Sequence, residues 1–322
     1  MNIEFLKCHG SGNDFIIIDE WTKGYRFTEE ERKEAAIQLS RRNSIIGSDG
    51  ILFVIGSSNA DAKMRMFNSD GSEAEMCGNG LRCVARYAIE KLKKESLMIE
   101  TMKAILPAAK VPDVYEGIQT FEVAIEPVSL NPASLPLQTG KASWKETIIP
   151  EIDKELTFTA LSVPNPHLVT IVEKVSDEQV KAVGKKANEL KQLLPNGTNV
   201  SFVKIINEST IFVRTYERGV GLTNACGTAM SAATLVSCLL GRQPLNEVIT
   251  VLNPGGMVQT VAEVRGDESY SIKLRGNATY EFSGSVQLDF HNAEKSDLIE
   301  TQDFPEETAA YKKMADYAKT MA

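Results

Sequence analysis

The segment MRMFNSDGSEAEMCGNG, residues 64–80, aligns without a gap with VRTYERGVGLTNACGTA, residues 213–229. At this offset the Cys-Gly pairs coincide, Cys77 with Cys226, and an arginine precedes each cysteine by the same spacing, Arg65 and Arg214. Two further segments echo each other: GNDFIII resembles PNPHLVTIV, and GSDGILFV resembles GTNVSFV. Because self-similarity at a nearly constant offset indicates a repeated structural unit, the sequence predicts a duplicated fold with one cysteine helix in each half.

The hydrophobic pattern predicts the same order of elements in both halves: a strand, a helix, two strands, a loop and a helix after the cysteine. In the first half we expect strands at 15–19, 51–55 and 63–67 and helices at 29–41 and 80–92. In the second half we expect strands at 168–172, 200–206 and 210–216 and helices at 177–194 and 228–240. The duplication therefore extends beyond the cysteine motif to whole helices and strands.

The strands VAIEPVS (123–129) and FTALSVP (158–164) lie between the halves, and Pro127, Pro132 and Pro136 are typical of a connector. Residues 278–290 predict another strand. Residues 305–322 predict a terminal helix with two glutamates in its first turn. We expect the boundary between the halves near residues 126–135.

Length, charge and cysteine content exclude several classes of protein. At 322 residues the chain is long enough for two domains, and its net charge of -8 argues against a nucleic-acid partner. It has neither a bilayer-length apolar run nor a signal-peptide pattern, so we expect a cytoplasmic protein without a membrane partner. Five cysteines without a CxxC pair predict reduced thiols, and three histidines without metal-ligand spacing predict no metal.

Each cysteine stands at a glycine-rich turn that enters a predicted helix, CGNG in one half and CGTA in the other. The first backbone N–H groups of a helix lack intrahelical partners, and the helix dipole favours negative charge there. A substrate carboxylate could bind at such helix ends, and the same field is expected to lower the pKa of the thiols. Cys77 and Cys226 are therefore predicted to act as bases.

Two thiols, one from each half, suit the inversion of a stereocentre. One takes the α-proton as a thiolate while the other returns a proton to the opposite face, which is general acid–base catalysis in both directions. Backbone dipoles in a dry cleft would stabilise the carbanion. Polar side chains of the duplicated loops offer donors and acceptors for a zwitterionic amino acid: Asn13, Asn68, Asn165, Asn199, Glu217 and Arg218.

The motifs HGSGNDFIIID, FNSDGSEAEMCGNGLRC, PNPH, NVSFV, YERGVG, ACGT and NPGG follow one another across residues 1–286. In this set and order the chain resembles the diaminopimelate epimerase family. The resemblance implies cofactor-independent interconversion of LL- and meso-diaminopimelate, in lysine and peptidoglycan biosynthesis, with Cys77 and Cys226 as the two bases. It implies that His167 and Glu217 support these bases. Side chains of Asn13, Asn68, Asn165, Asn199 and Arg218 would hold the substrate, and the backbone around Gly78, Asn79, Gly227 and Thr228 would hold its reacting carboxylate.

The resemblance also implies an α+β fold of two pseudo-symmetric domains, each a β-barrel-like sheet wrapped around a central helix, and a homodimer. The first domain would comprise residues 1–126, completed by 277–322, and the second residues 127–276. One departure lies next to Cys226, where Leu222 stands in place of the family's usual glutamate and so removes a carboxylate from that loop. Another is Ser48 within GSDG, where the family usually has alanine.

Other functions remain open at this point. Leu222 motivates a two-cysteine racemase of another amino acid, such as histidine, whereas a PhzF-like isomerase is disfavoured because it is expected to lack paired cysteines. From another class, the chain could be an amino-acid-binding protein or a thiol switch in which Cys77 and Cys226 oxidise. Arg65 and Arg82 are predicted to be structural or surface residues.

Overall fold

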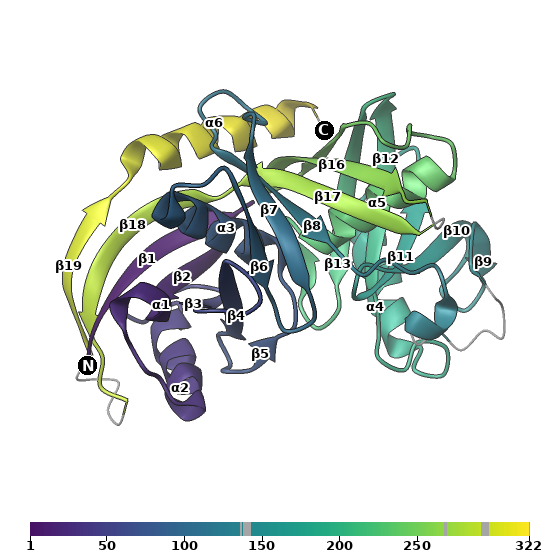
Figure 1. Cartoon of the computed structure of the whole chain (residues 1–322). Coiled ribbons are helices and arrows are strands. Elements are labelled where there is room, and N and C mark those ends of the chain that lie inside the picture. Colours follow the sequence, from purple (N-terminus) through teal and green to yellow (C-terminus); the bar gives the residue numbers. More distant parts are fainter. Residues whose placement is uncertain (136, 138–142, 267–268, 291–295, 322) are drawn as a thin grey trace. The chain divides into compact units, whose positions relative to one another are not determined.

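The structure is a computed structural model that describes residues 1–135, 137, 143–266, 269–290 and 296–321 (Figure 1). Pro136 of the predicted connector and Ala322 of the predicted terminal helix lie outside these residues. The fold is a mixed α+β fold with a large mixed sheet. The chain divides into two compact units, residues 1–123 with 276–313 and residues 124–275 with 314–322. Among the described residues, no helix combines the length and the apolar character needed to cross a membrane.

The elements of the first unit begin at the amino terminus and resume after the second. They are β1 (Asn2–Gly10), β2 (Asn13–Asp19), α1 (Glu20–Lys23), α2 (Glu29–Ser40), β3 (Gly50–Ile55), β4 (Ala62–Asn68), β5 (Glu73–Ala74), α3 (Gly78–Leu92), β6 (Ser96–Glu100), β7 (Ile105–Val111), β8 (Thr120–Ile125), β18 (Thr279–Gln287) and β19 (Asp297–Asp303). Helix α6 (Pro305–Met321) follows β19, and its residues are shared between the two units.

The elements of the second unit begin with a short 3-10 helix, η1 (Pro132–Ser134). They continue with β9 (Thr147–Ile149), β10 (Asp153–Ser162), β11 (Pro166–Ile171), α4 (Asp177–Glu189), β12 (Asn199–Asn207), β13 (Thr210–Glu217), β14 (Gly221–Thr223), α5 (Gly227–Leu239), β15 (Ile249–Asn253), β16 (Gly256–Val264) and β17 (Tyr270–Asn277).

Strand pairing follows the same succession in both units. In the first, β1–β2 is antiparallel, β2–β3 parallel, β3–β4 and β4–β5 antiparallel, β4–β6 parallel, and β6–β7–β8 antiparallel. In the second, β10–β11 is antiparallel, β11–β12 parallel, β12–β13 and β13–β14 antiparallel, β13–β15 parallel, and β15–β16–β17 antiparallel. The sequence repeat therefore corresponds to a repeat of topology.

The helix after each cysteine is buried within its own unit. Helix α3 contacts β1, β2, β3, β4, β6 and β7, and α5 contacts β10, β11, β12, β13, β15 and β16. The sequence of α5, GTAMSAATLVSCL, has no charged residue, and its residues from Gly227 to Cys238 are all buried. A helix that is apolar or small all round is stable only when protein surrounds it, so each cysteine is carried by a core element.

Each unit also has a hydrophobic core between its strands and its outer helix. In the first unit α2 covers a cluster in which the rings of Phe27, Phe53 and Phe67 meet edge to face, with centroids 5.5 and 5.6 Å apart. In the second, α4 contributes Val180 and Val183 to a cluster that includes Phe158 and Phe202. These aromatic and branched side chains bury the large apolar areas that dominate folding free energy.

Arg65 and Arg214 play the same structural role in the two units. The Arg65 guanidinium donates to both carboxylate oxygens of Glu29, at 2.6 Å each, and Glu29 is the first residue of α2. The Arg214 guanidinium donates to both oxygens of Asp177, at 2.7 and 2.8 Å, and Asp177 is the first residue of α4. A carboxylate at the start of a helix is stabilised by the helix dipole. By binding that carboxylate, each arginine fixes its outer helix to the strand that leads to the cysteine.

The observed elements differ from the predicted ones at several ends, and the strands β6, β7, β15, β16 and β17 were not predicted. Helix α4 stops at Glu189 rather than at residue 194, because Leu190 leaves the helical region, at φ -80° and ψ 63°. The cysteine helices begin at Gly78 and Gly227, earlier than expected. Strand β19 was not predicted; it pairs antiparallel with β18, which also pairs with β1 (Figure 1).

Candidate active site

Cys77 is the N-cap residue of α3. Its backbone is extended, at φ -147° and ψ 108°, and its Sγ accepts a hydrogen bond from the Gly80 backbone N–H at 3.4 Å. The glycine at position 80 has a packing reason, since a Cβ there would lie 2.8 Å from a methyl carbon of Leu52 on β3. The sequence CGNG therefore lets the helix start approach the sheet closely while the thiol lies among the first backbone N–H groups.

Two asparagines lie against the Cys77 thiol. The Asn13 Oδ1, at the start of β2, is 3.8 Å from Cys77 Sγ, within hydrogen-bonding distance of a thiol donor. The same oxygen accepts from Asn79 Nδ2 at 3.3 Å. Asn13, Cys77, Gly78 and Asn79 thus form one cluster. Asn68 lies at the end of β4 and donates to Ser72 Oγ at 2.9 Å, a bond within its own turn.

Burial raises the pKa of Cys77 from its ordinary value of 9.0 to about 11. Backbone N–H groups of Gly80 and Asn79 act in the lowering direction, as the helix-start position predicts, but they do not outweigh the loss of hydration. The expectation of a lowered thiol pKa is therefore wrong for the ligand-free chain. The charge of Arg82 also acts in the lowering direction without outweighing burial, so the Cys77 thiol stays protonated at neutral pH.

Cys226 is the N-cap residue of α5, with φ -133° and ψ 111°, nearly the same backbone conformation as Cys77. Its Sγ lies 3.5 Å from Thr228 Oγ1. Burial raises the pKa of Cys226 well above its ordinary value, and the carboxylate of Glu217 raises it further through its charge and a hydrogen bond. Cys226, Gly227, Thr228 and Glu217 therefore form the counterpart cluster in the second unit, and here too the predicted lowering of the pKa is wrong.

The remaining predicted residues of the second unit lie on neighbouring strands. His167 is fully buried on β11, and its Nε2 lies 2.8 Å from Asn165 Oδ1. Burial, followed by the charge of Arg218, lowers the pKa of His167 to about 3, so the ring is neutral. Asn199 is opposite His167 in the parallel β11–β12 pair, and its Oδ1 accepts from the Arg218 backbone N–H at 2.9 Å.

Leu222 lies on β14, opposite Tyr216 of β13, and packs against the hydrophobic core of the second unit. A leucine at this position adds apolar contact to that core. The carboxylate beside Cys226 comes from Glu217 on the facing strand. Leu222 thus removes a carboxylate from the loop, as the sequence indicates, while Glu217 still provides one beside Cys226.

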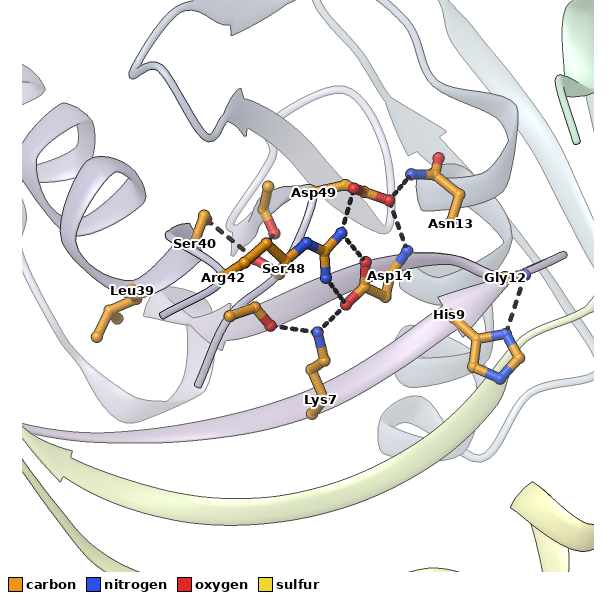
Figure 2. Close-up of polar contacts among 12 residues, drawn as sticks. Lys7, His9, Gly12, Asn13, Asp14, Leu39, Ser40, Arg42, Ser48 and Asp49 are labelled. Carbon is orange, nitrogen blue, oxygen red and sulfur yellow. Dashed lines mark hydrogen bonds and ion pairs between the residues drawn. The ribbon is translucent and has the colours of Figure 1, made fainter. Parts of the chain in front are cut away.

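Two residues of the first cluster were not predicted as part of the site. Asp49, in the GSDG segment before β3, accepts from Asn13 Nδ2 at 2.5 Å (Figure 2). Arg82 is fully buried rather than at the surface, and its guanidinium donates to Asn79 Oδ1 and to Ser11 Oγ, each at 3.0 Å. Arg82 follows Asn79 by three residues on α3, and this helical spacing was the available signal. Asp49 gave no such signal, because its partner is distant in the chain.

Within the ranges that the structure describes, no group of three or more histidine, cysteine, aspartate or glutamate residues could hold a metal ion. Each unit instead presents one thiol at a helix start, partly buried Cys77 in the first and buried Cys226 in the second, beside amide or hydroxyl groups. Such a helix start can hold an anion, and such a thiol can exchange a proton with a bound molecule.

The sequence is similar to known diaminopimelate epimerases over nearly its whole length. The family model described as diaminopimelate epimerase matches residues 5–113 and 159–281. The diaminopimelate epimerase of Clostridium acetobutylicum is 47% identical over 319 residues, which cover 99% of this chain and 96% of that protein. The diaminopimelate epimerase of Listeria welshimeri is 47% identical over 294 residues, 89% of each chain.

Solved structures match the fold at low sequence identity. A phenazine biosynthesis protein of the PhzF family from Bacillus anthracis gives a TM-score of 0.66 at 18% identity, covering 89% of this chain and all of that one. A hydroxyproline epimerase from Agrobacterium vitis gives a TM-score of 0.61 at 14% identity, covering 90% of this chain and 92% of the other. At such identities the likeness concerns the fold alone.

Proposed function

The chain belongs to the diaminopimelate epimerase family, and from this premise we propose that it is an isomerase that interconverts LL- and meso-diaminopimelate without a cofactor, as a step of lysine and peptidoglycan biosynthesis. The observation that carries the proposal is the recurrence of one arrangement: Cys77 and Cys226 are N-caps of buried helices at equivalent places in a repeated topology. The proposed reaction needs one thiol on each face of the α-carbon. One thiol would remove the proton, and the other would supply one.

The two thiols differ in a way that suits opposite protonation states. Cys77 receives backbone N–H groups, which favour a thiolate, whereas Cys226 faces the Glu217 carboxylate, which favours a thiol. Both are protonated in the ligand-free chain. A bound amino acid brings an ammonium group, and a nearby positive charge stabilises a thiolate. We therefore expect substrate binding to create the base.

The reacting carboxylate is proposed to lie at the two helix starts. Backbone N–H groups at Gly78, Asn79, Gly227 and Thr228 belong to the first turns of α3 and α5, where donors have no intrahelical acceptor. Removing the α-proton moves negative charge onto this carboxylate. Prearranged donors stabilise that charge more in the transition state than in the ground state, which is how they accelerate the step.

The side chains around the thiols are proposed to bind the rest of the substrate and to support the bases. Glu217 contacts Cys226 and is proposed to accept a proton from it, with neutral His167 keeping Asn165 in place. The substrate-binding groups are proposed to be the side chains of Asn13, Asn68, Asn165, Asn199 and Arg218. Their amides and guanidinium match the amino and carboxylate groups at the distal end of diaminopimelate.

The finer description of the fold is part of the same proposal. We propose two pseudo-symmetric domains, residues 1–126 completed by 277–322 and residues 127–276, each a barrel-like sheet around its cysteine helix. The contacts of α3 and α5 with six strands each support this description. A cytoplasmic homodimer remains a prediction, and sedimentation velocity over a range of concentrations would test the dimer.

The test is α-proton exchange in deuterated water under reducing conditions. Incubation with LL-diaminopimelate is expected to give meso-diaminopimelate with deuterium at the inverted carbon, measured by proton NMR and mass spectrometry. Cys77→Ser and Cys226→Ser are each expected to lose about 100-fold or more of this turnover, since a positioned base typically contributes that much. Cys238→Ser is the matched control, because Cys238 is also a thiol of α5 but lies at its other end.

Near-normal turnover in either serine variant would contradict the two-base mechanism. Exchange with histidine but not with diaminopimelate would reject the proposed substrate and leave the two-thiol chemistry standing. Binding without exchange of any α-hydrogen would favour the amino-acid-binding alternative over an enzyme.

A further inference from the structure

We propose that Asp49 is a positioning residue for the Cys77 half of the reaction: it holds the Asn13 side chain with its amide oxygen turned toward the thiol. The inference deepens the proposed function and rests on it. It concerns a residue that contacts neither thiol directly but contacts the side chain that does.

The orientation of Asn13 follows from what each neighbour can donate or accept. An amide has an NH₂ end that donates and an oxygen end that accepts, whereas an ionised carboxylate only accepts. Because Asp49 Oδ2 lies 2.5 Å from one end of Asn13, that end must be the NH₂ group. The oxygen then faces Cys77 Sγ at 3.8 Å and Asn79 Nδ2 at 3.3 Å.

Asp49 is itself held in place from several directions (Figure 2). Its backbone N–H donates to the Asp14 carbonyl at 2.9 Å, and its Oδ2 accepts from the Asp14 backbone N–H at 3.1 Å. Arg42 bridges the side chains of Asp49 and Asp14, and Lys7 binds Asp14 from the other side. The Asp49 carboxylate therefore sits in a fixed position beside the start of β2.

The bridge also keeps the Asp14 carboxylate ionised. Burial alone would raise the pKa of Asp14, but hydrogen bonds from Arg42 and Lys7 outweigh it and hold the value at about 2. Arg42 is 61% exposed, so its ion pairs are weak on their own. The hydrogen bond from Asn13 to Asp49, rather than the exposed ion pairs of Arg42, therefore orients the side chain that contacts the Cys77 thiol.

The second unit orients its corresponding asparagine by a different group. By strand register Gly50 of β3 corresponds to Asn199 of β12, so Asp49 corresponds to Thr198, whose hydroxyl bonds to the neighbouring Asn199 carbonyl. There, Asn165 is held at its oxygen end by His167 Nε2 at 2.8 Å. One asparagine is thus fixed through its NH₂ group, with its oxygen toward a thiol, and the other is fixed through its oxygen.

The end of the Asn13 amide that faces Cys77 affects the protonation of the thiol. An amide oxygen accepts the S–H hydrogen bond and so favours the thiol and fixes the direction of its proton. A reversed amide would point NH₂ at the sulfur, favour the thiolate and hinder return of the proton. Asp49 therefore tunes Cys77 for the step in which it acts as the acid.

The test compares Asp49→Asn with Asp61→Asn. Asp61 is a matched control, since its carboxylate also accepts from a cationic side chain, Lys94, and from a backbone N–H, that of Met98, but it lies away from both thiols. In Asp49→Asn the neighbour can both donate and accept, so either orientation of Asn13 is satisfied. We expect kcat to fall by about tenfold or more with a smaller change in KM, since misplaced groups lower the reactive fraction. Asp61→Asn is expected to keep its activity.

Two further readouts separate positioning from loss of structure. The pH midpoint of Cys77 alkylation is expected to move down in Asp49→Asn and to stay unchanged in Asp61→Asn, with the Cys226 midpoint constant in both. The double variant Asp49→Asn with Asn13→Ala is expected to be no slower than Asn13→Ala alone, because Asp49 acts through Asn13.

Wild-type kcat and an unmoved Cys77 midpoint in Asp49→Asn would overturn the inference, and so would multiplicative effects in the double variant. If Asp49→Asn does not fold, Asp49→Ala replaces it: it removes the acceptor at the NH₂ end of Asn13, so the amide orientation is no longer fixed and the same directions are expected. The alkylation midpoint needs no turnover. A chain inactive on every amino acid would refute the proposed function and still test the role of Asp49.

Discussion

Alkylation of Cys77 as a function of pH tests the buried helix-start thiol directly. Burial raises the pKa of Cys77 from 9.0 to about 11. Only the thiolate reacts with iodoacetamide, so the rate follows the ionised fraction. At about pH 8 that fraction is about one in ten for a pKa of 9 and about one in a thousand for a pKa of 11. The ligand-free chain should thus react about 100-fold more slowly than the unfolded chain.

The sequence around the thiol makes the assay specific. Tryptic cleavage after Arg82 separates the peptide that contains Cys77 from the one that contains Cys83, so mass spectrometry follows each thiol alone. Steric protection would slow alkylation at every pH and leave the midpoint unchanged. The unfolded chain in urea is the reference, and circular dichroism checks that the fold persists at high pH.

The expected result is a rate that rises about tenfold per pH unit and levels off near pH 11. A Cys77 midpoint at or below 9 in the folded, ligand-free chain would refute the argument that burial outweighs the helix start. Adding diaminopimelate is expected to lower the midpoint if the substrate ammonium creates the thiolate.

Two predictions concern stability. Gly184→Ala on α4 places a Cβ 2.3 to 2.7 Å from carbons of the Tyr216 side chain, so overpacking is expected to destabilise the chain by about 1–3 kcal/mol despite alanine's better helix propensity; an unchanged or raised midpoint of urea unfolding would contradict this. Glu307→Gln replaces the carboxylate that accepts two hydrogen bonds from the nearly buried Arg86, at 2.5 and 2.7 Å. Because Arg86 keeps its bond to the Ala278 carbonyl, we expect a loss of about 1–3 kcal/mol in urea unfolding, and no loss would show that the pair adds nothing to stability.

Much of the fold could be predicted because its signals are local in the chain. Apolar runs identified the strands that lead to each cysteine, β2, β3 and β4 in one unit and β11, β12 and β13 in the other. The Cys-Gly motifs identified the two buried helices to within two residues of their starts. Strand β19 escaped because all of its residues are exposed, so no apolar pattern distinguishes it from a loop. The end of α4 was misplaced because the helical periodicity of the sequence continues past Leu190, where the backbone leaves the helical region.

Some features of the candidate site could likewise be predicted from the sequence, whereas others could not. The cysteines, the asparagines and Glu217 were proposed from repeated motifs and His167 from the family resemblance, and family membership is shown by the matched sequence. The contacts of Asp49 with Asn13 and of Arg82 with Ser11 join residues far apart in the chain. No spacing rule predicts such contacts.

The sequence by itself determined the duplication, the order of elements and the placement of one thiol at each helix start, because these depend on residue type and spacing along the chain. Only the tertiary structure decided the protonation state of those thiols and the direction in which Asn13 points. A pKa reflects the balance between burial and nearby charges, and at Cys77 burial outweighs the helix dipole that the sequence suggested. An amide's orientation likewise depends on which donors and acceptors the fold brings to each of its ends.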